Sequence, residues 1–241
     1  MAPYGFVLDL MSGCHAYVFV SMSLSVGPRL QLGSRRDKLD SMSDLPRQTH
    51  DHQRYKTCRA IDASGHAHAL TFSCYQRQLF LTRDRSRLWT IEAIRKACLD
   101  HRFHLWAFVL MPEHVHLLVC PAERDYSTSG FLKTLKQSVA SKALAFVREQ
   151  APEFLARMED RQPNGKVSHR FWQRARGYDR NVVNPRYVWE LIDYIHANPV
   201  RRRLCDRAED WPWSSARFYL SGEPGPLPID RESLPEDPRT R

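Results

Sequence analysis

Two histidines lie two residues apart in Met111-Pro-Glu-His-Val-His-Leu-Leu-Val-Cys120, directly before an apolar run. Side chains of a β-strand alternate between its faces, so His114 and His116 would point one way and Val115 and Leu117 the other. Two imidazoles on one face of a rigid strand can share a metal ion. The spacing therefore predicts half of a metal site, and a third ligand must come from elsewhere in the chain.

The same spacing occurs twice more, at His50/His52 and His66/His68. The first of these pairs lies in a polar stretch, where we expect both rings to face solvent. The second pair lies at the start of an expected strand and is typical of the residues with which a strand begins. Only the pair before the apolar run has a turn and a buried strand to fix both rings, and without a metal it would be two strand histidines bonded to neighbouring groups.

A second candidate feature is formed by Tyr194 and Asn198, which lie four residues apart in a stretch with helical apolar spacing. Residues i and i+4 share one face of a helix. Asn184 is a good N-cap and Pro185 suits the first helical position, so we expect this helix to begin there and to end at Pro199. Each residue alone has an ordinary explanation, as a half-buried helix tyrosine and as a helix stop.

The segment His169–Arg203 surrounds these residues with positive charge, since it holds eight arginines against three acidic residues, a formal charge of +5. Tyrosine, tryptophan and phenylalanine are interleaved with the arginines. This composition suits phosphate contact and base stacking on single strands, although a solvated basic face over core aromatics has the same composition. The arginines that we expect to contact nucleic acid are Arg170, Arg174, Arg176, Arg180, Arg201 and Arg202.

The whole chain of 241 residues carries 36 Lys and Arg against 27 Asp and Glu, a net charge of +9. A balance this basic favours a polyanionic partner, most often nucleic acid, over a merely solvated surface. The six cysteines form no CxxC pair, which favours reduced thiols in a cytosolic protein over a disulfide framework. No apolar run is long enough for a membrane-spanning helix, so we expect no membrane partner and a cytoplasmic, nucleoid-associated location.

Apolar periodicity predicts an α+β domain. The expected elements are strands at His68–Tyr75, Phe103–Leu110, His114–Cys120 and His169–Gln173, and helices at Arg85–His101 and Ser127–Glu149. Their order is the split βαβ pattern of a ferredoxin-like sandwich, an antiparallel sheet with helices on one face and the other face free for a ligand. A further C-terminal helix carries Tyr194.

Three parts of the chain differ in composition and in apolar periodicity. Residues 1–54 show no sustained period and are expected to be a disordered or weakly ordered extension, whose first part is untranslated if Met42 is the true start. Residues 55–220 form the expected domain. Residues 221–241 are rich in proline, glycine and charge and are expected to be a tail.

Five ordered motifs closely resemble the REP-associated tyrosine transposases, single-tyrosine members of the HUH endonuclease superfamily, where REP denotes a repetitive extragenic palindrome. The motifs are Met111-Pro-Glu-His-Val-His-Leu-Leu118, Phe171-Trp-Gln-Arg174, Tyr178-Asp-Arg180, Tyr194-Ile-His-Ala-Asn-Pro-Val200 and Trp211-Pro-Trp-Ser-Ser215. The resemblance covers roughly residues 55–220. It departs from the family pattern at Glu113, where relatives commonly have Asn, and in the spacing near residues 174–178.

The resemblance implies that His114, His116 and Asn198 bind a divalent metal, Mg or Mn, and that Tyr194 is the nucleophile. It implies a metal-dependent endonuclease and strand transferase that acts on single-stranded hairpin DNA through a covalent 5′-phosphotyrosine. Dimers and monomers both occur among such proteins. A non-catalytic, domesticated hairpin-binding protein is the alternative, and a rolling-circle initiator or relaxase is a third reading that shares the histidine pair.

Overall fold

The computed structural model describes residues 61–174 and 177–240 of the chain. The expected extension at 1–54, the histidines His50 and His52, and Arg176 lie outside the described residues. The proposed boundary at 55 therefore stays a prediction, and the boundary at 220 also stays one.

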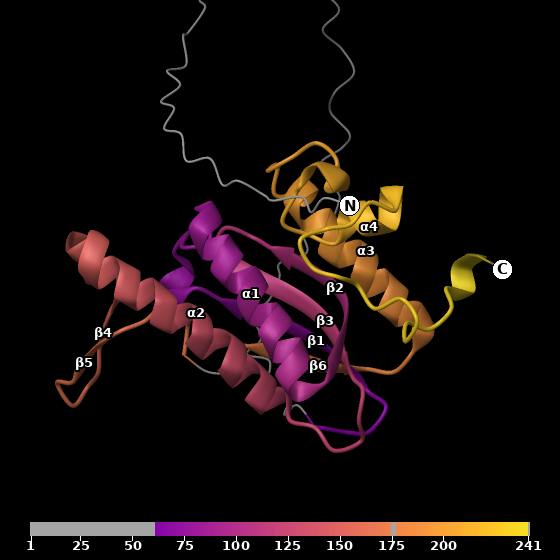
Figure 1. Ribbon diagram of the computed structural model, residues 1–241, viewed down its shortest axis with the longest axis horizontal. Helices are drawn as coiled ribbons and strands as arrows, with labels where there is room; N and C mark the ends of the chain where they lie inside the picture. The colour runs from indigo at the N-terminus through magenta and orange to yellow at the C-terminus, as the bar shows by residue number, and fades with distance from the viewer. Residues whose placement is uncertain (1–60, 175–176, 241) are drawn as a thin grey trace, which may run out of the picture. The chain divides into compact units, whose positions relative to one another are not determined.

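A four-stranded antiparallel sheet forms the centre of the fold (Figure 1). Its strands are β1 (Ala67–Ser73), β2 (Phe103–Leu110), β3 (His114–Pro121) and β6 (Tyr178–Val182), in the spatial order β2-β3-β1-β6. The helices α1 (Asp84–His101) and α2 (Thr128–Gln150) connect β1 to β2 and β3 to β6. This is the predicted split βαβ arrangement, and the α+β fold class is confirmed.

The two faces of the sheet have separate apolar clusters. Leu70 and Phe72 of β1 pack with α1 and α2, which lie side by side over one face (Figure 1). Ala69 of β1 and Leu118 of β3 point to the other face, where they pack with α3 (Pro185–Arg201). Alternation along the strands explains the division. The second face is therefore only partly free, because α3 covers the part formed by β2 and β3.

The expected fourth strand at His169–Gln173 was wrong. Within the described ranges, this stretch contains the end of β5 and a single bridge between Trp172 and Cys74. Phe171 and Trp172 are buried in the core, and the chain then passes Gly177, whose φ of +88° suits glycine. The fourth strand of the sheet is β6, which pairs with β1 at the sheet edge and which the sequence periodicity did not indicate.

Helix α3 begins as predicted, since the side chain of Asn184 accepts a hydrogen bond from the backbone N–H of Arg186 at 2.9 Å. The expectation that Pro199 ends the helix was wrong, because the helix continues to Arg201. Proline lacks the N–H that would bond to the carbonyl of Ile195. The side-chain amide of Asn198 donates to that carbonyl at 3.4 Å and to the carbonyl of Tyr194 at 2.7 Å, which compensates for the missing bond.

The remaining elements are short. They are the helix α4 (Ala216–Ser221), the strands β4 (Glu159–Arg161) and β5 (Val167–His169), and the 3-10 helices Tyr75–Arg77, Pro152–Met158, Ala208–Asp210 and Pro238–Thr240. The stretch expected as a tail packs along the edge strand β2, where the N–H of Asp230 donates to the carbonyl of Leu105 and the indole of Trp106 donates to Ser233. No helix of residues 61–174 and 177–240 is long and apolar enough to cross a membrane.

Candidate active site

The histidine pair points to the α3 side of the sheet, as the strand period predicts. The Nε2 atoms of His114 and His116 lie 3.0 Å apart, with the ring planes at 86°. Both residues are at least nine-tenths buried. Two nitrogen atoms that each lie about 2.1 Å from one ion, at a right angle to each other, are about 3 Å apart. The spacing of the pair therefore fits joint binding of a divalent cation.

Both imidazoles are held by their other nitrogen. Nδ1 of His116 bonds to Oγ1 of Thr71 at 2.7 Å, and Nδ1 of His114 lies 3.0 Å from Oε1 of Glu113. A second group that fixes the ring and leaves Nε2 for an ion is the usual arrangement around metal-binding histidines. Burial, together with the nearby His114, lowers the pKa of His116 to about 3, and burial also lowers the pKa of His114. Neutral rings are the form that binds metals.

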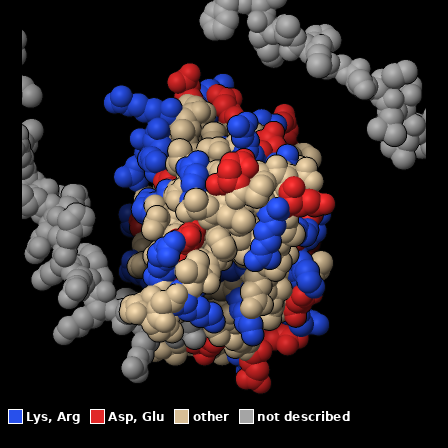
Figure 2. Space-filling view, turned by 90° about the vertical axis from the view of Figure 1, so that its left-hand side faces the viewer, with Lys and Arg blue, Asp and Glu red and all other residues tan. Residues whose placement is uncertain are grey.

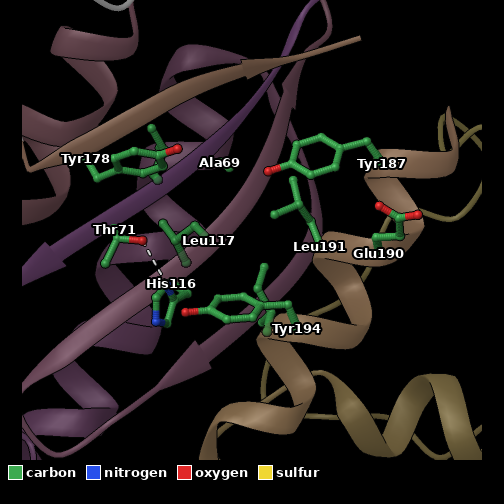
Figure 3. Close-up of a pocket in the computed structure, with 11 residues that line it drawn as sticks. Ala69, Thr71, His116, Leu117, Tyr178, Tyr187, Glu190, Leu191 and Tyr194 are labelled. Carbon is green, nitrogen blue, oxygen red and sulfur yellow. Dashed lines mark hydrogen bonds between the residues drawn. The ribbon is translucent and has the colours of Figure 1, made fainter. Parts of the chain in front are cut away.

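Tyr194 of α3 stands next to the pair. Its ring centroid lies 5.8 Å from that of His116, at an interplanar angle of 84°, and Figure 3 shows its hydroxyl end beside that imidazole. The tyrosine is 43% exposed, in contrast to the buried histidines. The guanidinium of Arg201 lies 5.3 Å from the centroid of the tyrosine ring. A partly exposed tyrosine, a cation and two neutral imidazoles are thus gathered beside α3.

Glu113 ties the histidine turn to α3. Its Oε1 accepts from Nη1 of Arg202 at 2.7 Å and lies 3.5 Å from Nη2 of Arg77. Burial raises the pKa of this carboxyl, but the bond from Arg202 and the contact with His114 outweigh that effect and leave the pKa lowered. Its second oxygen, Oε2, is buried and has no hydrogen-bond partner among the described residues. The acid that departs from the family pattern is therefore a partner of His114 in this structure.

Asn198 lies between two contacts that join α3 to the histidine strand. Tyr194, one turn before it, contacts His116, and Arg202, one turn after it, contacts Glu113. Residues four apart share a helix face, so Asn198 lies on the face that is turned toward β3. It is 8% exposed. Its amide nitrogen is used within the helix, which leaves the amide oxygen as its donor atom toward an ion.

No group of three or more His, Cys, Asp or Glu side chains in the described part of the chain is arranged to hold a metal ion. Asn198 carries a possible ligand atom of another kind, its amide oxygen. An amide oxygen is a ligand that Mg and Mn accept. The donor set of two imidazoles and one amide fits these ions.

The arginines expected to contact nucleic acid fall into two groups. Arg201 and Arg202 flank the site, at the end of α3. Arg170 and Arg174 lie elsewhere and both form ion pairs with Asp160, which lowers the pKa of that carboxyl to about 2, chiefly through its bond from Arg170. Figure 2 shows basic and acidic side chains interspersed on the face that it draws. Part of the positive charge counted in the sequence is thus neutralised locally.

The fifth described arginine of the set, Arg180, belongs with the first group, since it also lies beside the site. Nη1 of Arg180 donates to the hydroxyl of Tyr187 at 2.7 Å, and its guanidinium lies 4.6 Å from the centroid of that ring. Tyr187 lines a hollow of about 500 Å³ between β1, β6 and α3, whose lining also includes Tyr178, His116 and Tyr194 (Figure 3). This groove leads to the candidate nucleophile.

The sequence reasoning missed Thr71, whose hydroxyl holds His116. Thr71 pairs with His116 across β1 and β3, so only the strand register brings the two together. Only the alternation of side chains along β1 could have indicated Thr71. It alternates with the core residues Leu70 and Phe72 and must therefore face the side of the histidine pair.

Comparison with known proteins agrees with this geometry. The family model described as "Transposase IS200 like" matches residues 63–198. A REP-associated tyrosine transposase of Escherichia coli K12 is 29% identical over 156 residues, which cover 62% of this chain and 79% of that protein. A Haemophilus influenzae protein assigned as a REP-associated tyrosine transposase is 25% identical over 131 residues, covering 54% of this chain and 69% of that protein.

Among solved structures, a REP-associated tyrosine transposase bound to a REP hairpin superposes with a TM-score of 0.52 at 22% identity, over 75% of this chain and 97% of that one. This likeness confirms the fold. The family model covers more than half of the chain and therefore shows the family of the protein. The chain belongs to the IS200-like transposase family.

Proposed function

We propose that the protein is a metal-dependent endonuclease and strand transferase that acts on single-stranded hairpin DNA, with REP-like palindromes as its substrate class. Tyr194 is the nucleophile, and His114, His116 and Asn198 hold Mg or Mn. The observation that carries the proposal is the contact of Tyr194 with His116, because it sets an accessible hydroxyl beside two nitrogen atoms with the spacing of metal ligands.

The reaction is a transesterification. The Oη atom of Tyr194 attacks the scissile phosphorus, so the P–Oη bond forms while the P–O3′ bond breaks. The tyrosine loses its proton, and the departing strand ends in a free 3′-OH. The reverse attack by a 3′-OH releases the tyrosine and rejoins DNA, so the phosphodiester count is conserved and no external energy source is needed.

Each residue near the tyrosine has a defined part in this chemistry. Thr71 and Glu113 hold the histidine rings, and Arg201 offers positive charge beside the attacking hydroxyl. A bound divalent ion would polarise the scissile phosphate and stabilise the negative charge that develops on it. The ligand set is neutral, and therefore we expect the ion to bind weakly until the phosphate of the substrate supplies negative charge.

The REP hairpin is proposed as substrate because the homologous structure was determined with one. The test uses end-labelled single-stranded palindromes from the host genome, incubated with the full-length protein and Mg. The proposal expects a covalent protein–DNA adduct on denaturing gels, mapped by mass spectrometry to Tyr194. Hairpin binding without any adduct in Mg or Mn would instead support the non-catalytic hairpin-binding alternative.

A further inference from the structure

The groove between β1, β6 and α3 opens beside the nucleophile. Its volume of about 500 Å³ lies within the range of about 300–1,000 Å³ that is usual for ligand pockets. We propose that this groove holds one unstacked base of the single strand, next to the phosphate that Tyr194 attacks. The proposal rests on the proposed function and adds a base-binding subsite to it.

Tyr178 forms the β6 side of the groove. It is 51% exposed, and its side chain makes no hydrogen bond or ring contact among the described residues. In Figure 3, its hydroxyl end points across the groove toward Tyr187. An exposed aromatic ring with a free face is the platform on which single-stranded nucleic acids stack their bases.

The opposite side of the groove is fixed in place. Tyr187 is held by Arg180 through both its hydroxyl and its ring face. Arg180 lies two residues after Tyr178 on β6, on the same face of the strand, and brings positive charge to the rim. A base that enters the groove would contact the free face of Tyr178 on one side and the ring of Tyr187, which Arg180 holds, on the other.

The floor of the groove explains why there is room for a base. Ala69 of β1 and Leu191 of α3 line it (Figure 3). Ala69 stands on the same strand face as Thr71, so a larger side chain at position 69 would project into the hollow. A largely apolar floor suits a base, which has little charge, better than it suits a phosphate.

A second hollow of about 200 Å³ continues the groove beyond Tyr178. The two hollows share Thr71 and Tyr178, and the second is also lined by Lys136 and Arg174. The cation of Lys136 on one side of Tyr178 and the aromatic rings on the other match the alternating chemistry of a single strand. The structure thus predicts a path with the reacting phosphate at Tyr194, a base against Tyr178, and a neighbouring phosphate at Lys136.

The test uses hairpin oligonucleotides whose single-stranded flank carries the fluorescent base 2-aminopurine at one position at a time. The full-length protein is titrated in EDTA, which prevents cleavage. We expect one flank position to be quenched by stacking. Tyr178→Ala should abolish that quenching and raise the Kd of the flanked hairpin by about tenfold, whereas Tyr178→Phe keeps both. Ala69→Leu should act like Tyr178→Ala by filling the groove.

Two controls make the result specific. A hairpin without a flank should bind all variants equally, and Leu99→Ala, an exposed residue on α1, should behave as wild type. Unchanged quenching in Tyr178→Ala, or the absence of any quenched position, would overturn the inference. Adduct formation by wild-type protein in Mg is measured separately. Adducts without quenching contradict only the base subsite, and quenching without adducts contradicts only the proposed cleavage.

Discussion

The carboxylate of Glu113 and the guanidinium of Arg202 are joined at 2.7 Å, and the same carboxylate oxygen holds Nδ1 of His114. One buried oxygen therefore connects the histidine turn to the helix that carries Tyr194. The relative position of the candidate nucleophile and the candidate metal ligands depends on this connection as well as on apolar packing.

Removal of the Arg202 cation should destabilise the protein, because the carboxylate of Glu113 is buried. Arg202→Met leaves the carboxylate of Glu113 without its strongest partner, and we expect the free energy of unfolding to fall by about 1–3 kcal/mol. Arg203→Met, a neighbouring exposed arginine, should change it by less than about 0.5 kcal/mol. Chemical denaturation of both variants measures the difference. Equal losses would show that the ion pair has no special part in joining the two elements.

Metal binding should depend on DNA. The ligands proposed for the ion are all neutral, so electron paramagnetic resonance of Mn²⁺ should show binding that tightens by about tenfold when hairpin DNA is added. His114→Ala should abolish this DNA-dependent binding. His104→Ala removes a histidine of β2 that pairs with Asp230, and it should leave the DNA-dependent binding of Mn²⁺ intact. Tight Mn²⁺ binding to the free protein, unaffected by His114→Ala, would contradict the proposed site.

The arginines should differ in their contribution to DNA affinity. Arg201 lies against the ring of Tyr194, whereas Arg170 is bound to Asp160. We expect Arg201→Ala to lower the slope of log K against log salt by about 0.7, the value for one lost phosphate contact on a single strand. Arg170→Ala should leave the slope close to that of wild type. Fluorescence anisotropy across a salt series gives both slopes, and the opposite ranking would be inconsistent with the placement of the strand.

Periodicity was enough to predict most of the sheet. The bounds of β2 at Phe103–Leu110 agree with the expected strand, because its mostly apolar residues lie between Arg102 and the turn at Pro112. The fourth strand was misplaced, since Phe171 and Trp172 look like strand residues but are buried beyond the end of β1. Strand pairing of β6 depends on its register with β1, and such long-range pairing leaves little trace in local sequence.

The candidate site, too, could be predicted only in part from the sequence. The orientation of His114 and His116 follows from the strand period, and the shared face of Tyr194 and Asn198 follows from the helix period. The groups that hold the two histidines could not be predicted from these periods, because the contact with Thr71 comes from the register of β1 and β3. The role of Arg202 as the partner of a buried acid likewise required the packing of α3 on the sheet.

Gly177 is predicted to be required where the chain enters β6. A Cβ there would lie 2.2 Å from the carbonyl oxygen of Thr71, and the φ of the residue is +88°. Gly222 also has a positive φ, but a Cβ there would meet no atom within 4 Å. Gly222→Ala should cost about 1 kcal/mol of unfolding free energy, from backbone strain alone. Gly177→Ala should cost more than that, and equal losses in thermal or chemical unfolding would contradict the close approach.

The central claim is that Tyr194 forms a covalent bond to DNA. The most direct measurement compares wild type, Tyr194→Phe and Tyr126→Phe, the last of which removes a hydroxyl bonded to His68 on the sheet. Each is incubated with a labelled hairpin and Mg and then run on a denaturing gel. The account predicts adducts for wild type and Tyr126→Phe, and none for Tyr194→Phe despite hairpin binding similar to that of wild type. Adduct formation by Tyr194→Phe would contradict it.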